Sequence, residues 1–178
     1  RDKKVITEAK KLEEKYPKRF KFHQLKFSQL ETISIKNVDV VIFDLGLSSI
    51  QLDDFDRGFS FKSNKKLNMT MGLNEITALD AINTLSEIDL KRVIKILGDE
   101  KEASRIAKNI VNYRDIKKIQ NTNELVKIIK KSKKKNYLNK INPCTKTFQA
   151  LRIFVNKEIT ELINGIINAT KKLKPGGK

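Results

Sequence analysis

The sequence is poor in cysteine and histidine and contains no long apolar run. Its 178 residues include one cysteine, Cys144, and one histidine, His23. A single cysteine excludes an internal disulfide framework, and two metal-binding side chains so far apart do not predict a zinc site. No run approaches the roughly 18 apolar residues that a membrane-spanning helix needs, and no signal peptide is visible. We therefore expect an intracellular protein of a reducing compartment, the cytoplasm.

Acidic residues are also scarce relative to basic ones. The chain has 38 lysines and arginines against 21 aspartates and glutamates, which gives a net charge of +17. Such a charge attracts polyanions and accelerates encounter with them, so nucleic acid is the natural partner. The alternative interpretation is that a lysine-rich genome supplies these lysines at solvated positions. Lysine greatly outnumbers arginine, which argues against base-specific bidentate contacts.

The pattern of apolar residues predicts an α/β arrangement in the first part of the chain. Residues 2–16 repeat apolar side chains at helical spacing. Residues 20–24 alternate apolar and polar side chains, as a half-buried strand does. Residues 38–43 are apolar and β-branched, which is typical of a strand buried on both faces of a parallel sheet. This order of elements fits a doubly wound α/β unit.

Helices dominate the remainder of the sequence. Thr77 and Ser86 are expected to cap two of them. Apolar periodicity predicts a third helix from Ala103 and a fourth from about Thr122. One apolar stripe predicts a single long helix over residues 145–172, which the following Pro-Gly-Gly turn ends. The apolar positions of that stripe are Phe148, Leu151, Val155, Ile159, Leu162 and Ile166.

Together these elements predict an α/β domain interrupted by an all-α insertion. We expect the first part of the α/β core over residues 1–56, a loop and the helical insertion over 57–142, and a helix that returns to the core over 143–178. Both ends of the chain are abrupt, because Arg1 directly precedes a helical pattern and Lys178 directly follows a turn. We therefore expect a fragment of a longer protein.

Asp44 is the most informative single residue, because it follows the predicted strand of residues 38–43. In doubly wound sheets, ligands bind beyond the carboxyl ends of the strands. Gly46 then permits a tight turn or a close backbone approach. A carboxylate at this place either orients a ligand amine or hydroxyl or caps the strand, and position alone does not separate the two roles.

Several blocks of the sequence resemble a known family. Residues 41–54 read VIFDLGLSSIQLDD, and residues 57–61 read RGFSF. They resemble the bacterial small-subunit (16S) ribosomal RNA cytosine-N4 methyltransferases, whose hallmark reads roughly DLGVSSPQLDD, then RGFSF after a short gap. Residues 145–158 (TKTFQALRIFVNKE) and 173–177 (LKPGG) match further blocks in the family's order. The matching blocks span almost the whole chain.

The resemblance implies a fold, a substrate and a cofactor. The fold would be a partial Rossmann-like class I methyltransferase sheet interrupted by an all-α insertion that recognises RNA. The substrate would be a cytosine of 16S ribosomal RNA near the decoding centre. The family's S-adenosylmethionine contacts fall here on Phe27, Asp44 and Gln51. An aromatic face can pack on adenine, while a carboxylate and an amide can satisfy the polar groups of the cofactor.

The resemblance also limits the choice of catalytic residues. The exocyclic amine of cytosine is a poor nucleophile, so catalysis must align it with the methyl donor and accept charge from nitrogen. We expect Asp44, Ser48 and Ser49 to shape the site and to offer acceptors near the amine. Asp53 and Asp54 are candidate general bases, although loop or helix-capping roles are more common for such residues. No carboxylate cluster calls for a metal.

The predicted partner is 16S ribosomal RNA within the small ribosomal subunit, and no membrane is involved. The oligomeric state stays open, with a homodimer as one option. Phosphate contacts are expected on the loop and the insertion. The candidate cations are Arg57, Lys62, Lys65, Lys66, Arg105, Arg114, Lys133, Lys134 and Lys135.

The sequence departs from the family's pattern in two places. Ile50 stands where the family usually has proline. Residues 67–72 read LNMTMG where the family reads near LDMRMD, so two acids and an arginine are missing. We expect this loop to serve as a lid. The family's glycine-rich loop and first acidic ligand would precede Arg1, so this chain by itself is expected to bind little or no cofactor.

Two other functions compete with this interpretation. A DNA amino-methyltransferase would carry a Pro-Pro-aromatic step after the predicted strand, where this chain has residues 45–49, LGLSS. A non-catalytic RNA-binding or ribosome-assembly module could retain the methyltransferase scaffold, and the altered loop at residues 67–72 is its support.

Overall fold

The computed structural model describes residues 2, 5–72, 74, 76–133 and 141–178. The chain forms two compact units, and each is described by itself. We call residues 1–46, 71–73 and 157–178 the terminal unit, and residues 47–70 and 74–156 the helical unit. The compact units thus divide the chain near 46 and 156, whereas the sequence led us to expect boundaries near 56 and 142.

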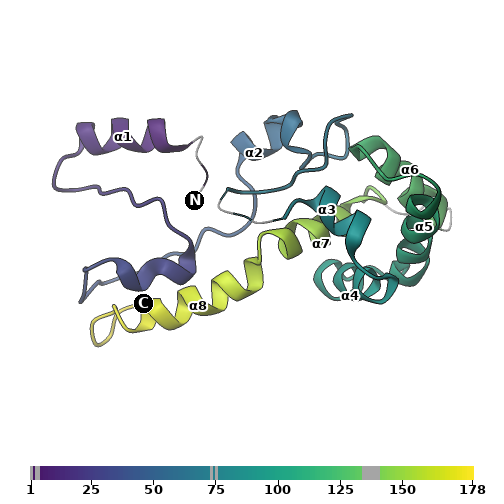
Figure 1. Cartoon of the computed structure of the whole chain (residues 1–178). Helices are drawn as coiled ribbons and strands as arrows, with labels where there is room; N and C mark the ends of the chain where they lie inside the picture. Colours follow the sequence, from purple (N-terminus) through teal and green to yellow (C-terminus); the bar gives the residue numbers. More distant parts are fainter. Residues whose placement is uncertain (1, 3–4, 73, 75, 134–140) are drawn as a thin grey trace. The chain divides into compact units, whose positions relative to one another are not determined.

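The helical unit contains seven of the described helices (Figure 1). Both predicted caps are confirmed, because the Thr77 hydroxyl accepts the Asp80 N–H and the Ser86 hydroxyl accepts the Asp89 N–H, each at 3.1 Å. Hydrogen bonds from the side chain and backbone of Thr77 also lower the pKa of Asp80. The helices are α2 (Ser49–Asp53), η3 (Phe55–Arg57), α3 (Ala78–Thr84), α4 (Glu87–Gly98), α5 (Ala103–Ile116), α6 (Thr122–Ser132) and α7 (Thr145–Val155).

The core of the helical unit lies where α4 packs against α5 and α7 and where α5 packs against α6. Gly98 lets α4 and α7 approach closely, because a Cβ atom there would lie 2.4 Å from the Lys146 carbonyl oxygen. The predicted apolar stripes are therefore the packing faces. The large side chains that are fully buried on these helices are Leu90, Ile94, Ile106, Ile110, Leu125, Ile129 and Leu151.

The prediction of a single long helix over residues 145–172 is wrong, because this segment forms two helices, α7 and α8 (Glu158–Thr170). The chain breaks at Asn156 and Lys157, and Lys157 has φ of 50°, in the left-handed region. The Asn156 side chain is 1% exposed and donates to the Met69 and Arg152 carbonyls, both at 2.8 Å. An asparagine that bonds to the backbone in this way competes with helix continuation.

The terminal unit is built on α1 (Ile6–Lys15), the 3-10 helix η2 (Phe27–Thr32) and α8, with α8 packed against η2. The stripe predicted for α8 is wrong, since Ile159 and Ile166 are about half exposed while Glu161 and Asn168 are buried. The break at Lys157 restarts the helix in a new phase. Polar side chains then face η2, where they find backbone partners.

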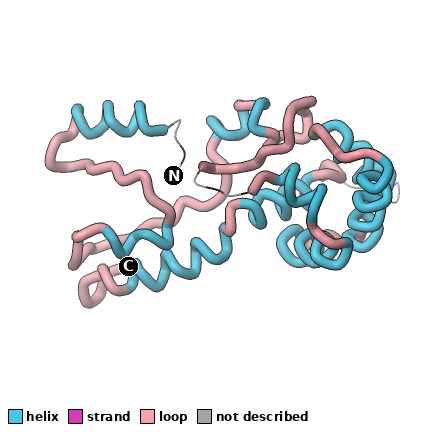
Figure 2. Tube along the Cα trace, in the orientation of Figure 1, coloured by secondary structure: helices cyan, strands magenta, loops and turns pink. Residues whose placement is uncertain are grey.

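The strands expected at residues 20–24 and 38–43 are not confirmed, because the described residues contain no strand (Figure 2). Val38 forms one parallel bridge with Leu173. The Val38 N–H donates to the Lys172 carbonyl at 3.0 Å, and the Lys174 N–H donates to the Val38 carbonyl at 3.1 Å. Ile42 is 84% exposed, against the burial expected for it. Two further backbone bonds link this segment to Lys178, whose carbonyl accepts the Val41 N–H at 2.9 Å and whose N–H donates to the Asp39 carbonyl at 3.0 Å. A strand needs a regular ladder of successive bonds to a neighbouring strand, and among the described residues these bonds amount to one bridge and a short pairing with the end of the chain.

None of the helices among the described residues is both long enough and apolar enough to cross a membrane.

Candidate active site

Phe27, a predicted cofactor contact, begins η2 and leaves 40% of its surface exposed. Its ring packs edge to face on Phe43, with ring centroids 5.4 Å apart and an interplanar angle of 85°. Such T-shaped pairs are favourable and orient both rings. The structure therefore brings Phe27 beside Phe43, the residue that directly precedes Asp44, although Phe27 and Phe43 are 16 positions apart in sequence.

Asp44 is exposed and is followed by Gly46, whose φ of 114° is one that other residues rarely adopt. The described side chains donate no hydrogen bond to the Asp44 carboxylate. The turn around Gly46 is open, because a Cβ atom added to it would meet nothing within 4 Å. Position alone left open whether Asp44 is a structural cap. Within the described part of the chain, its carboxylate has no hydrogen-bond donor that such a cap would bind.

Ser48, Ser49 and Gln51 belong to the helical unit, whereas Phe27 and Asp44 belong to the terminal unit. Ser48 is the N-cap of α2, and its N–H donates to the Gln51 side-chain oxygen at 3.1 Å. Gln51 is 8% exposed, while Ser48 and Ser49 are exposed. The local capping box thus explains the spacing of Ser48 and Gln51.

The loop expected to serve as a lid is anchored over residues 67–70. Leu67 and Met69 are fully buried. The Met69 N–H donates to the Arg57 carbonyl at 2.8 Å, and the Leu79 N–H donates to the Leu67 carbonyl at 2.7 Å. The apolar side chains at these positions therefore make this part of the loop a piece of the core of the helical unit.

The predicted phosphate contacts near this loop differ in their surroundings. The Arg57 guanidinium donates to the Thr70 carbonyl at 2.6 Å and lies 5.2 Å from the centre of the Phe59 ring. Lys65 pairs with Asp56 at 3.0 Å on the surface. Lys62 and Lys66 are exposed. Arg57 thus holds the loop, while Lys62 and Lys66 extend toward solvent.

The predicted cations of the insertion also divide into structural and exposed groups. The Arg114 guanidinium donates to the Ile82 and Leu85 carbonyls at 2.7 and 2.6 Å, where it satisfies the end of α3. Lys133 pairs with the buried Glu100 at 2.5 Å. Arg105 pairs with Glu102 at 2.5 Å near the surface. Lys134 and Lys135 lie outside the described residues.

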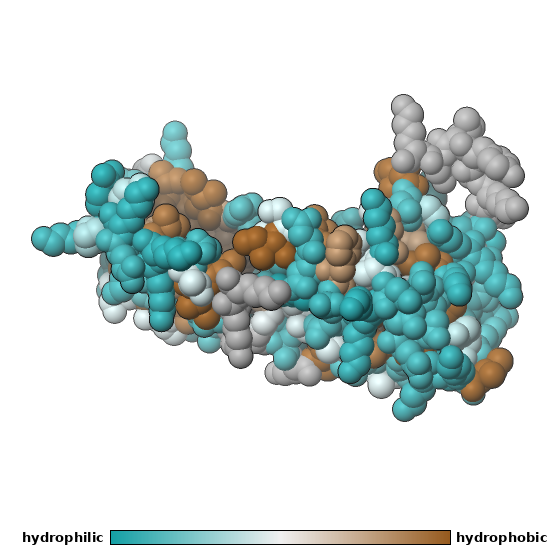
Figure 3. Space-filling view, turned by 90° about the horizontal axis from the view of Figure 1, so that it is seen from above, coloured by the Kyte–Doolittle hydropathy of each residue, from teal (hydrophilic) through white to brown (hydrophobic). Residues whose placement is uncertain are grey.

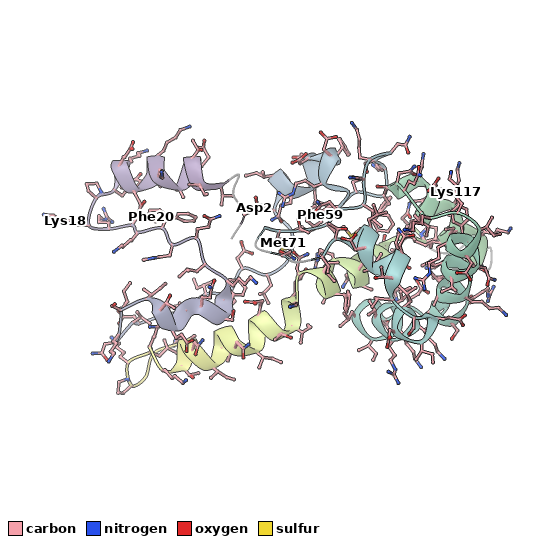
Figure 4. All side chains as sticks on the ribbon, viewed as in Figure 1. Asp2, Lys18, Phe20, Phe59, Met71 and Lys117 are labelled. Atoms are coloured by element: carbon pink, nitrogen blue, oxygen red, sulfur yellow. The ribbon has the colours of Figure 1, made fainter. Side chains whose placement is uncertain are left out.

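Further lysines give the helical unit its exposed positive charge. In the space-filling view, the end that carries α5 and α6 is largely hydrophilic (Figure 3). Lys117, labelled in Figure 4, is exposed at the end of α5 and pairs loosely with Glu124 at 3.4 Å. Lys127, Lys130 and Lys131 of α6 are exposed as well.

Cys144 and His23 do not join these residues. Cys144 is fully buried beside α7, and burial raises the pKa of its thiol against the opposing effect of Lys130 and Lys133. His23 lines an open pocket of about 470 Å³ in the terminal unit, formed by residues 21–25 and 32–35, which contains neither Phe27 nor Asp44. No group of three or more potential metal ligands occurs among the described residues.

Two polar residues of α8 that contact η2, Glu161 and Asn168, were not predicted from the sequence. The Ser28 N–H donates to the Glu161 carboxylate at 3.0 Å, and the Asn168 amide donates to the Ser28 carbonyl at 2.9 Å. The signal that could have found them is an acid and an amide seven residues apart on one helix face with Gly165 between them.

Comparison with known proteins identifies the family. The MraW methylase family matches residues 1–178. The chain is 43% identical over 182 residues to the ribosomal RNA small subunit methyltransferase H of Ehrlichia canis (strain Jake), with 99% of this chain and 61% of that protein covered. It is 40% identical over 178 residues to the protein of the same name from Bartonella quintana (strain Toulouse), with 100% of this chain and 54% of that protein covered.

The chain spans between about half and three fifths of the length of these relatives. The family implies a class I methyltransferase fold, whose sheet the described residues do not contain. The match over the whole length, together with identities of 40% or more, establishes that the chain belongs to the MraW methylase family.

Proposed function

We propose that this chain is part of an S-adenosylmethionine-dependent methyltransferase that modifies small-subunit ribosomal RNA. The proposed target is the N4 amine of a cytosine of 16S RNA near the decoding centre. The observation that carries the proposal is the exposed ring of Phe27, held against Phe43 beside the open Asp44 turn. The names of the relatives support ribosomal RNA as the substrate class.

The residues present fit the cofactor. The part of Phe27 that remains exposed can pack on adenine, and the exposed Asp44 carboxylate can accept hydrogen bonds from hydroxyl or amino groups. Gln51 is proposed as a third contact, although its side-chain oxygen already accepts the Ser48 N–H. When bound, the cofactor supplies an activated methyl group.

The chemistry assigned to the Asp44–Ser49 turn is positioning and acceptance of charge. The N4 amine of cytosine gains positive charge when it attacks, so oxygen acceptors placed beside it lower the barrier. Asp44, Ser48 and Ser49 offer such oxygens and are all exposed. Because Ser48 starts α2, the capping box with Gln51 fixes the backbone from which the two serines project.

The experiment that tests the proposed function is methyl transfer by the complete gene product. Small ribosomal subunits and cofactor with a labelled methyl group are the substrates, and label is expected on a cytosine amine. The substitution Phe27→Ala is expected to weaken cofactor binding about tenfold, because aromatic stacking on a base contributes roughly 1–3 kcal/mol. Calorimetric titration of the cofactor measures this change.

Phe20→Ala is the matched control, because Phe20 (labelled in Figure 4) is also 40% exposed and lies in the terminal unit on the segment that follows α1. This variant is expected to bind the cofactor as the unsubstituted protein does. Equal loss in both variants would refute the role of Phe27. Binding of RNA without any transfer of label would favour the ribosome-assembly module, and label on DNA would favour a DNA methyltransferase.

The RNA surface is tested by comparing two cations. Lys62→Ala is expected to reduce the salt dependence of RNA binding by about one phosphate contact and to leave stability unchanged. Arg114→Ala is expected to lower the free energy of unfolding by about 2 kcal/mol, because the Ile82 and Leu85 carbonyls lose their donor, and to leave the salt dependence unchanged. RNA binding at several salt concentrations and urea unfolding are the measurements. An Arg114→Ala variant with full stability and a reduced salt dependence would contradict this division.

A further inference from the structure

Three residues of α8 lie on the helix face that packs against η2. Glu161, Gly165 and Asn168 are spaced by four and three positions, so they share one face. Glu161 is 8% exposed and Asn168 is 7% exposed. The carboxylate of Glu161 accepts the N–H of Ser28, and the amide of Asn168 donates to the carbonyl of the same residue. Both backbone groups of Ser28 are thus held by α8.

Gly165 lies between these two side chains and brings the helix backbone against the aromatic pair. A Cβ atom at Gly165 would lie 2.8 Å from Cβ of Phe27 and 3.0 Å from Cε1 of Phe43. Lys172 lies two residues after the end of α8, and its ammonium donates at 2.5 Å to the carbonyl of Ile33, the residue that follows η2. The start of η2 is therefore held by α8 at Ser28, and the residue after η2 is held by Lys172, which follows α8.

We propose that Glu161 and Asn168 are positioning residues that set the direction of the Phe27 ring for the cofactor. Ser28 directly follows Phe27, so fixing both of its backbone groups fixes the direction in which the Phe27 side chain leaves the chain. The Phe43 ring then restricts the Phe27 ring itself, and the Gly165 backbone lies against Cβ of Phe27 and the ring of Phe43. A ring ordered in advance spares the cofactor the entropic cost of ordering it on binding.

The choice of a buried carboxylate supports a geometric role. Removing a carboxylate from water is costly, and here its Oε2 atom accepts a backbone N–H. An apolar residue would pack against η2 at lower cost but would not select one backbone position. The inference rests on the proposed function, because Phe27 matters in this way only if it contacts the cofactor.

Cofactor affinity in the complete protein tests the inference through a double-mutant cycle. Glu161→Ala and Asn168→Ala are each expected to weaken S-adenosylmethionine binding about threefold to tenfold, the effect of losing one hydrogen bond. In a Phe27→Ala background, the same substitutions are expected to have almost no further effect, because the group through which they act is gone. Equal losses in both backgrounds would overturn the inference, since a general effect on the fold does not depend on Phe27.

Two further variants guard against misinterpretation. Asn164→Ala changes an exposed residue of the same helix and is expected to leave affinity unchanged. Glu161→Gln keeps an oxygen acceptor and is expected to bind nearly as the unsubstituted protein does, and a tenfold loss in a folded Glu161→Gln variant would overturn the assigned hydrogen bond. If Glu161→Ala fails to fold, Asn168→Ala in the two backgrounds provides the test. If the unsubstituted protein binds cofactor and all α8 variants bind equally well, the inference alone fails. If the unsubstituted complete protein does not bind cofactor, the proposed function fails and the inference falls with it.

Discussion

Replacing Asn156 by alanine is expected to lower the free energy of unfolding of the helical unit by about 3 kcal/mol. The Asn156 side chain is 1% exposed, donates to the Met69 and Arg152 carbonyls and accepts a hydrogen bond from the Asn74 amide at 3.0 Å. Alanine leaves the Met69 carbonyl without this donor in a buried place. Met69 also has φ of 57°, a conformation that costs roughly 1 kcal/mol and that this bond helps to hold.

Hydrogen exchange of the buried amides of α4 and α7 measures this loss, because it reports on the helical unit separately from the terminal unit. Asn156→Asp is expected to be at least as damaging, since a carboxylate oxygen would replace the donor that faces two carbonyls. Asn112→Ala is the control, because Asn112 is an exposed residue of α5 in the same unit, and its side chain is expected to contribute less than about 0.5 kcal/mol. Unchanged exchange in Asn156→Ala would show that the hydrogen bonds do not stabilise the loop.

Gly58→Ala is expected to destabilise the helical unit by roughly 2–4 kcal/mol, through backbone strain and steric overlap together. Gly58 has φ of 70° and ends η3. A Cβ atom there would lie 2.4 Å from the Lys66 carbonyl oxygen and 2.9 Å from the Leu67 Cα atom. Neither is the end of a flexible side chain, so the backbone of the loop would have to move.

Gly176→Ala separates the two contributions, because Gly176 has a similar φ of 79° but nothing within 4 Å of its Cβ position. Its expected cost is the strain alone, about 1 kcal/mol. Hydrogen exchange in each unit and thermal unfolding followed by circular dichroism measure the two variants. Equal losses would show that the overlap at Gly58 is relieved without cost.

Gly58 and Asn156 come from different sequence blocks of the family, but both contact the loop that contains residues 66–70. Gly58 and Arg57 belong to the RGFSF block, and Asn156 belongs to the block over residues 145–158. The absence of a side chain at Gly58 lets the backbone of residues 66–68 approach closely. Arg57 donates to the Thr70 carbonyl, and Asn156 donates to the Met69 carbonyl. Residues of both blocks therefore anchor the loop within the helical unit.

The sequence by itself determined the features that depend on near neighbours. The caps at Thr77 and Ser86 were predicted correctly, because each is an interaction with a residue three positions along the chain. These caps predicted the start of α3 and α4, and apolar periodicity, which is also local, predicted α5 and α6. The family also followed from the sequence, since each of its blocks is a short run of consecutive residues that can be read without the fold.

The tertiary structure alone decided the features that depend on distant partners. The break before α8 arises because Asn156 bonds to a carbonyl 87 residues earlier. The buried face of α8 is polar because Glu161 and Asn168 meet Ser28, 133 and 140 residues away. Arg114 caps the end of α3 because the carbonyls of Ile82 and Leu85 lie within hydrogen-bond distance of its guanidinium. Periodicity records which side chains avoid water, but it does not record which distant backbone groups need a partner, and that need placed these polar side chains.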